Sequence, residues 1–110
     1  MLNRAVTAGA DAPHSLANYA LCRAVNKDFA AAEDYLTAAE FYASTMHEKA
    51  VVSFNRAIIH LLRDNKPGAY EELRNAVKLS KKAIISYANY SKLFKEASAA
   101  DPEIARILQD

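Results

Sequence analysis

The chain alternates apolar and polar residues with the spacing of amphipathic helices, and short polar breaks separate these stretches. Residues with turn chemistry, such as Asp, Asn, Ser, Thr, Pro and Gly, gather at 10–13, 26–28, 44–45, 64–68 and 100–102. With a frayed helical piece at each end of the chain, the expected helices run over 13–26, 29–43, 46–63, 68–80 and 82–98. Between Gly68 and Ala100 there is no further Gly or Pro, so this stretch forms either one long helix or two; we favour a break at Ser80.

Three of the breaks carry residues that start helices. Thr45 is followed three residues later by Glu48, which is the spacing of a capping box. Asp101 precedes Pro102, which suits an N-cap followed by proline at the first helical position. Asp28 is a third N-cap candidate. Because the turns between the helices are short, we expect neighbouring helices to be antiparallel.

Composition agrees with one all-α domain over residues 1–110. Of the residues, 52% are hydrophobic and 25% are charged, and there are only 2 Gly and 3 Pro. The formal net charge of +1 creates no strong field toward nucleic acid or lipid. The single Cys22 cannot form an internal disulfide, and no apolar run is long enough for membrane insertion. We therefore expect a soluble domain.

Four apolar residues have an identical counterpart 37 positions later, which pairs Ala20 with Ala57, Ala32 with Ala69, Leu36 with Leu73, and Ala39 with Ala76. This recurrence indicates a repeat over 13–44, a second over 50–81 and a degenerate third over 84–110. Leu2 and Ala5 precede Leu36 and Ala39 by 34 positions, so residues 1–10 are expected to be the remnant of a preceding repeat. The start of the chain lacks the long apolar stretch of a secretion signal, which favours a cytoplasmic location, although a fragment of a longer array would look the same.

This pattern resembles the tetratricopeptide repeat, a helix pair with small residues where its two helices cross. In the first repeat the matching residues are Leu16, Tyr19, Ala20, Asp28, Phe29, Ala32, Leu36 and Ala39. The second repeat departs from the pattern at Ser53 and Arg56, where large apolar residues are usual, and the closing proline of the family is missing at Ser44 and Lys81. The resemblance implies a short right-handed α-solenoid of two to three antiparallel helix pairs.

The resemblance also implies a non-enzymatic scaffold, in which the first helix of each pair lines a concave groove that holds a partner peptide or helix. Asn18, Asn55 and Asn89 take equivalent positions, and a side-chain amide can both donate to and accept from a peptide unit. The expected partner-binding residues are Asn18, Leu21, Phe54, Asn55, Ile58, Asn89 and Lys92. Three alternatives stay open. The asparagines simply face water, or the chain is a helical oligomerisation domain that self-associates through apolar end faces, or it is a small enzyme or ligand-binding domain with a pocket around His60 or Tyr70.

Other candidate chemistry is sparse. His14, His47 and His60 are not spaced as metal ligands with one another or with Cys22, so we expect no metal, cofactor or Cys–His nucleophile. Residues 1–55 carry four basic and six acidic residues, whereas 56–110 carry ten and seven. In the second half Arg74, Lys78, Lys81 and Lys82 share one helical stripe, which suits an acidic partner, but without a nucleic-acid motif we expect no nucleic-acid binding.

Overall fold

The computed structural model describes residues 12–99 and 101–109, and in these residues it contains six α-helices and no β-strand. The helices are α2 (Ala12–Val25), α3 (Phe29–Tyr42), α4 (Met46–Leu62), α5 (Lys66–Tyr90), α6 (Lys92–Ala97) and α7 (Pro102–Gln109). The all-α class expected from the sequence is confirmed. The expected repeat remnant at 1–10, with Leu2 and Ala5, lies outside the described residues.

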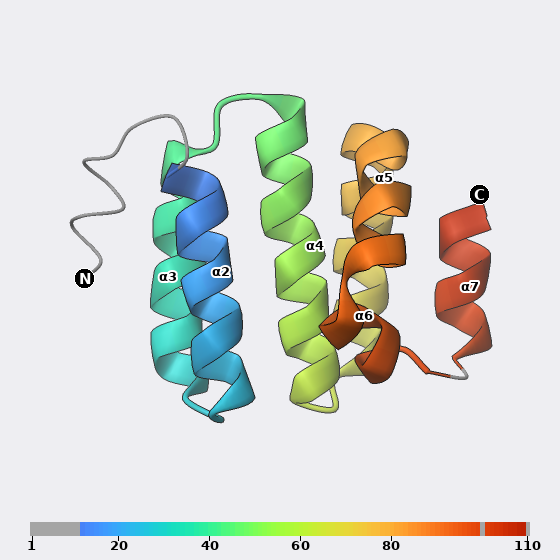
Figure 1. The fold of residues 1–110 in the computed structure, drawn as a ribbon, viewed down its shortest axis with the longest axis horizontal. Coiled ribbons are helices and arrows are strands. Elements are labelled where there is room, and N and C mark those ends of the chain that lie inside the picture. The colour runs from blue at the N-terminus through green and yellow to red at the C-terminus, as the bar shows by residue number, and fades with distance from the viewer. Residues whose placement is uncertain (1–11, 100, 110) are drawn as a thin grey trace.

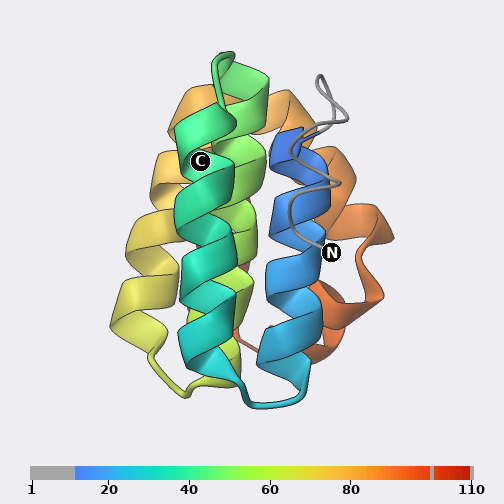
Figure 2. The same cartoon turned by 90° about the vertical axis from the view of Figure 1, so that its left-hand side faces the viewer.

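The long helices stand side by side and run in alternating directions, as their short turns predict (Figure 1). α2 and α3 form a pair at one side, α4 lies at the centre, and α5 and α7 follow on the other side. Figure 2 shows the molecule from the side of α2 and α3, with α4 behind them. α4 packs most extensively against α5, and α2 packs against both α3 and α4. α4 is therefore the central helix of the array.

The break expected at Ser80 is confirmed, because this residue leaves helical geometry with φ −162° and ψ 86°. It divides α5 into a first half, residues 66–79, and a second half, residues 81–90. The first half stands behind the second in Figure 1, and Figure 2 separates the two halves to the left and right of the molecule. The chain thus reverses its direction at Ser80, although neither Gly nor Pro lies at this break.

The helix expected over 82–98 is wrong in one respect, because a second break interrupts it at Ser91. α5 ends at Tyr90 and α6 begins at Lys92. Ser91 has φ −83° and ψ 107°, and its hydroxyl oxygen accepts a hydrogen bond from the backbone N–H of Phe94 at 3.1 Å. The serine thereby caps a new helix whose first turn carries Phe94 into the core.

The three predicted helix starts are confirmed. The hydroxyl of Thr45 accepts from the backbone N–H of Glu48 at 3.1 Å, and Oε1 of Glu48 accepts from the backbone N–H of Thr45 at 3.1 Å. Oδ1 of Asp101 accepts from the N–H groups of Glu103 and Ile104 at the start of α7. Asp28 accepts from an N–H group in the first turn of α3. Local side-chain chemistry therefore sets these boundaries.

The turns after α2 and after α4 share one backbone conformation. Lys27 and Asp64 have φ of 67° and 61°, in the left-handed region. The next residue, Asp28 or Asn65, caps the following helix by accepting from the backbone N–H three residues later. Its own N–H donates to the carbonyl oxygen five residues earlier, at 2.9 Å in the first turn and 2.8 Å in the second. Because of the Asn65 cap, α5 begins at residue 66 and not at the expected residue 68.

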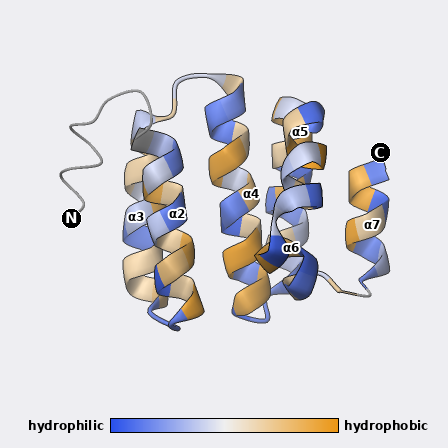
Figure 3. Ribbon diagram, viewed as in Figure 1, coloured by the Kyte–Doolittle hydropathy of each residue, from blue (hydrophilic) through white to orange (hydrophobic). Residues whose placement is uncertain are grey.

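Two clusters of buried side chains form the core. The α2–α4 cluster contains Leu16, Ala20, Ala24, Ala32, Leu36, Ala39, Val52 and Ile59. The α4–α7 cluster contains Ala50, Phe54, Ala57, Ile58, Leu73, Ala76, Ile84, Ala88, Phe94, Ile104 and Ile107. All eight residues that recur 37 positions apart are buried. Along the helices in Figure 3, hydrophobic residues recur between hydrophilic ones, which is the pattern that buries one face of a helix.

Arg56, one of the departures from the repeat pattern, has an ionic partner on α3. Its Nη1 donates to Oε2 of Glu40 at 3.1 Å, and its Nε lies 4.0 Å from Oε1 of Glu33. The arginine side chain is mostly covered, whereas the two carboxylates are more exposed. Arg56 therefore connects α4 to α3 by ionic contacts, at a position where the repeat pattern usually has a large apolar residue.

Candidate functional site

Four of the seven predicted partner-binding residues have exposed or half-buried side chains. Asn18 on α2, Asn89 in the second half of α5 and Lys92 on α6 are exposed. Leu21 on α2 is half-buried and packs against both core clusters. Whether these residues bind a partner stays a prediction.

The structure does not place the other three predicted residues at the surface. Phe54, Asn55 and Ile58 have exposed fractions of only 3%, 6% and 0%. All three belong to α4, which is covered by α2 on one side and by α5 and α6 on the other. The expected row of three accessible asparagines is therefore interrupted at its centre.

Three polar side chains from three helices converge at a position that the sequence analysis did not single out. Nε2 of His14 on α2 lies 3.3 Å from the hydroxyl oxygen of Tyr87 on α5, and Nε2 of His47 on α4 lies 3.1 Å from the same atom. The two imidazole rings stack, with centroids 5.7 Å apart. We call His14, His47 and Tyr87 the His–Tyr cluster.

The hydroxyl of Tyr87 can serve both imidazoles. The Tyr87 ring stacks on Phe54 with centroids 6.0 Å apart, and burial raises the pKa of Tyr87 above its ordinary value of 10.0. The hydroxyl therefore keeps its proton at neutral pH. Because it has one O–H donor and two acceptor lone pairs, it can donate to one imidazole while it accepts an N–H from the other. These polar contacts connect α2 with α4 and α5, and the Tyr87 ring packs on the Phe54 ring beside them.

In the sequence, helical spacing is the signal that links the two histidines of this cluster to the predicted partner-binding residues. His14 precedes Asn18 by four residues and His47 precedes Phe54 by seven, so each histidine shares a helix face with a predicted partner-binding residue. The spacing of the histidines in the sequence supports neither a metal site nor a nucleophile pair. Their meeting with Tyr87 depends on how three helices pack, which spacing within one helix does not reveal.

A surface pocket of about 370 Å³ adjoins the His–Tyr cluster where α5 breaks. Its lining consists of His47, Ser80, Lys82, Ala83, Ser86 and Tyr87. We call it the α5-break pocket. Five of these six side chains carry an N–H or O–H group, and none is a carboxylate.

The predicted basic stripe on α5 is divided by the same break. Before the break, Nη2 of Arg74 lies 3.0 Å from Oε2 of Glu103 on α7. After it, Nζ of Lys81 donates to the backbone carbonyl of Gln109 at 3.3 Å. Lys82 lines the α5-break pocket instead. The four residues therefore do not act as one continuous cationic surface.

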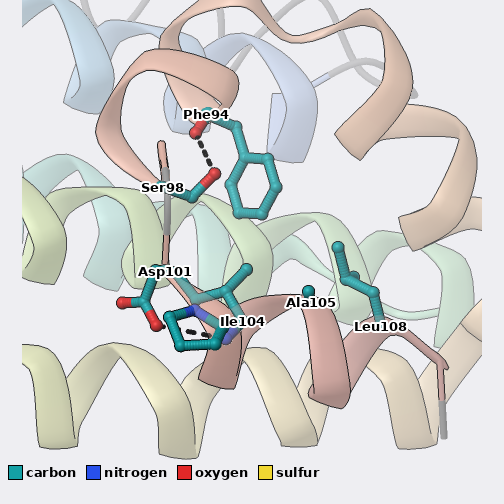
Figure 4. Close-up of a pocket in the computed structure, with 7 residues that line it drawn as sticks. Phe94, Ser98, Asp101, Ile104, Ala105 and Leu108 are labelled. Atoms are coloured by element: carbon teal, nitrogen blue, oxygen red, sulfur yellow. Dashed lines mark hydrogen bonds between the residues drawn. The ribbon is translucent and has the colours of Figure 1, made fainter.

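A second pocket, of about 510 Å³, lies between α6 and α7 and is mainly apolar. Its lining residues are Phe94, Ser98, Asp101, Pro102, Ile104, Ala105 and Leu108. Figure 4 shows the Phe94 ring directed from α6 toward Ile104 and Ala105. The polar groups at its edge are used within the fold, since the Ser98 hydroxyl donates to the Phe94 carbonyl at 2.7 Å.

Asp101 at the same edge is also engaged within the fold. The hydroxyl of Tyr70 donates to Oδ2 of Asp101 at 2.9 Å, and this hydrogen bond raises the pKa of Tyr70. Desolvation favours the neutral form of Asp101, but the hydrogen bonds from Tyr70 and from the N–H groups of Ile104 and Glu103 outweigh it and lower the pKa of the carboxyl group. These contacts identify Asp101 as a cap for α7.

Over residues 12–99 and 101–109, no three His, Cys, Asp or Glu side chains are placed to hold a metal ion. In the same part of the chain, no helix combines the length and apolar character needed to cross a bilayer. Comparisons with protein-family models, curated proteins and solved structures found no match for the chain.

Proposed function

We propose that the chain is a non-enzymatic scaffold that binds a peptide or helix of a partner protein on the surface around Asn18 and the His–Tyr cluster. In this proposal the pair α2–α3 and the pair formed by α4 and the first half of α5 are tetratricopeptide-like repeats of a short right-handed stack. α2, α4 and the second half of α5 are then the first helices of successive pairs. The proposed binding surface is the side that these three helices share.

The equivalence of the two interhelical turns supports the repeat interpretation best. Lys27 and Asp64 are 37 positions apart, as are the caps Asp28 and Asn65, and the hydrogen bonds of the two turns match. A non-glycine residue in the left-handed region is uncommon, so its recurrence at the spacing of the buried Ala and Leu residues is a second, independent signal. Sequence and backbone geometry thus support the same period.

The chemistry of the proposed surface favours a peptide as the ligand. Asn18 is exposed one helical turn after His14, which contacts Tyr87. An amide, two imidazoles and a hydroxyl offer both donors and acceptors to a peptide backbone. The tyrosine ring adds an apolar face beside them, and aromatic residues are frequent anchors in protein interfaces.

Selection from a displayed peptide library, followed by affinity measurement, tests this function. Asn18→Arg places a long charged side chain on the proposed surface, and Asn75→Arg makes the same change at an exposed position in the first half of α5. We expect Asn18→Arg to weaken binding of a selected peptide about tenfold, or about 1.4 kcal/mol, and Asn75→Arg to have little effect. Selection of no peptide, or equal effects of the two variants, would contradict the proposal.

Self-association is a second candidate function, and exposed apolar side chains favour it. Phe41 and Met46, beside the turn between α3 and α4, are 80% and 66% exposed, and Tyr90 at the end of α5 is 86% exposed. The turn between α3 and α4 and the end of α5 lie at opposite ends of the helices (Figure 1), so each end exposes its own apolar side chains, and such exposed apolar surface is typical of interaction sites. If this function is correct, the mass measured by light scattering rises with concentration, and Phe41→Ser restores the monomer. A monomer at every concentration would exclude it.

A further inference from the structure

We infer that the α5-break pocket binds a phosphoryl oxyanion, and that Lys82 supplies the charge that holds it. This inference goes beyond the proposed function, because the pocket binds the anion whether the phosphoryl group is free or part of a peptide. The pocket is lined by His47 from α4 and by Ser80, Lys82, Ala83, Ser86 and Tyr87 from α5. Its proximity to the His–Tyr cluster allows one peptide to contact both.

The lining suits an anion because donors dominate it. Lys82 carries an ammonium group, Ser80 and Ser86 carry hydroxyls, and His47 carries a ring N–H. A carboxylate among the lining residues would repel an anion, and the lining contains none. A phosphoryl group presents three oxygens and between one and two negative charges near neutral pH, so it can accept from several of these donors together.

The break in α5 explains why these donors share one pocket. Ser80 leaves the helix with φ −162°, and the chain then turns into the second half of α5. Lys82 and Ser86 are four residues apart and lie on one side of this second half, next to the side that carries Ala83 and Tyr87. In an unbroken helix, residues 66–90 would instead continue in one direction.

The His–Tyr cluster prepares His47 for this role. When the Tyr87 hydroxyl donates to Nε2 of His47, the neutral imidazole carries its proton on Nδ1, so a donor remains for the anion. His14 completes the chain by donating its Nε2–H to the oxygen of Tyr87. In this arrangement His14 on α2 donates to Tyr87 on α5, and Tyr87 donates to His47 on α4. In this tautomer, Nδ1 of His47 carries the N–H that is left for a ligand.

Titration of the isotope-labelled chain with inorganic phosphate at constant ionic strength tests the inference directly. We expect saturable shifts of the backbone amide signals of Lys82, Ala83 and Ser86. Lys82→Gln is expected to raise the Kd about fivefold, equivalent to about 1 kcal/mol. The matched control is Lys78→Gln, an exposed lysine on the same helix that lines a different pocket, and it is expected to leave the Kd within about twofold.

Two further experiments are needed. One shows whether the anion is free phosphate or part of a peptide, and the other covers the case in which Lys82→Gln does not fold. A short phosphoserine peptide is compared with its unphosphorylated form, and tighter binding than inorganic phosphate would assign the pocket to a phosphorylated partner. Equal binding of phosphate and the phosphopeptide would assign it to the free anion. Ser86→Ala, at an exposed position, gives a second reduced-affinity variant if Lys82→Gln does not fold. The absence of saturable shifts, or equal loss in Lys82→Gln and Lys78→Gln, would overturn the inference and leave the proposed scaffold function untouched.

Discussion

Gly68 at the start of α5 shows how a single residue depends on its helix cap. A Cβ added at this position would lie 2.6 Å from Nδ2 and 3.1 Å from Cγ of Asn65. The Asn65 side chain is held in place because its Oδ1 accepts from the Gly68 N–H at 3.2 Å and its Nδ2 lies 3.2 Å from Nδ1 of His60. An added methyl group would therefore displace the cap.

We predict that Gly68→Ala fails to stabilise the protein, although Ala is favoured over Gly inside a helix by about 1 kcal/mol. Displacing the Asn65 cap costs a similar amount, about 1 kcal/mol. In an Asn65→Ala background the cap is already absent, so Gly68→Ala should there raise the free energy of unfolding. Urea unfolding of the wild type, the two single variants and the double variant measures the coupling energy between the two positions, which we expect to be about 1 kcal/mol. Additive effects would show that the cap does not restrict this position.

The carboxylate of Glu48 completes the N-terminal capping box of α4, and its charge makes the stability of the protein depend on pH. Hydrogen bonds from the backbone N–H groups of Ser44 and Thr45, and from the Ser44 hydroxyl, lower the pKa of Glu48 below its ordinary value of 4.5. A carboxyl group with a lowered pKa in the folded state stabilises the protein above its ordinary pKa, and this contribution is lost as the pH falls through the folded pKa. The stabilisation by the charged form is therefore fully present at neutral pH.

We predict that the Tm difference between the wild type and Glu48→Gln is largest near neutral pH and shrinks below about pH 4.5. Glutamine keeps an oxygen that can accept the backbone N–H groups, so the variant removes mainly the charge-dependent part of the cap. Thermal unfolding followed by circular dichroism across this range is the measurement. A difference that stays constant with pH would contradict a role for the charged carboxylate.

At the scale of the elements, sequence analysis was most accurate where a break has its own local chemistry. The capping box at Thr45 and the caps Asp28 and Asp101 are present, and the break favoured at Ser80 is present as well. The start of α6 at Ser91 was missed because helical periodicity continues through it. Ser91 does cap α6, but a lone serine is a weak signal, and the packing of the Phe94 ring on Phe54, with centroids 4.9 Å apart, joins residues that are distant in the sequence.

α6 has only six residues, so its stability must come from packing of Phe94. Phe94→Ala is predicted to lower the free energy of unfolding by about 3–5 kcal/mol, because the ring is only 3% exposed. The matched control is Leu93→Ala, at the half-buried neighbouring position, which should cost clearly less. Urea unfolding compares the two variants. Equal losses would mean that α6 is not anchored by this ring.

At the scale of the whole molecule, the two core clusters are coupled through α4. This helix contributes Val52 and Ile59 to the α2–α4 cluster and Phe54 and Ile58 to the α4–α7 cluster. The same central position explains why three of the predicted partner-binding residues, Phe54, Asn55 and Ile58, are buried. Burial of one helix by its neighbours on both sides is set by the packing of the whole molecule, and its own residue pattern does not show which side stays open.

This coupling predicts a single cooperative unfolding transition. Leu36→Ala and Leu73→Ala remove equivalent, fully buried side chains from the two clusters. Each should lower the free energy of unfolding by about 2–5 kcal/mol and shift the entire transition. Unfolding followed by both circular dichroism and tyrosine fluorescence tests this. Two separate transitions, with only one displaced by each variant, would show that the clusters unfold independently.

We propose that the chain binds a partner through the surface around Asn18 and the His–Tyr cluster, where α2, α4 and the second half of α5 meet. The most direct test is a map of backbone amide shifts in the labelled chain when a selected peptide is added. If this proposal is correct, the largest shifts fall around His14, Asn18, His47 and Tyr87. Shifts concentrated around Phe41 and on the exposed side of α3, with none at these four residues, would contradict it.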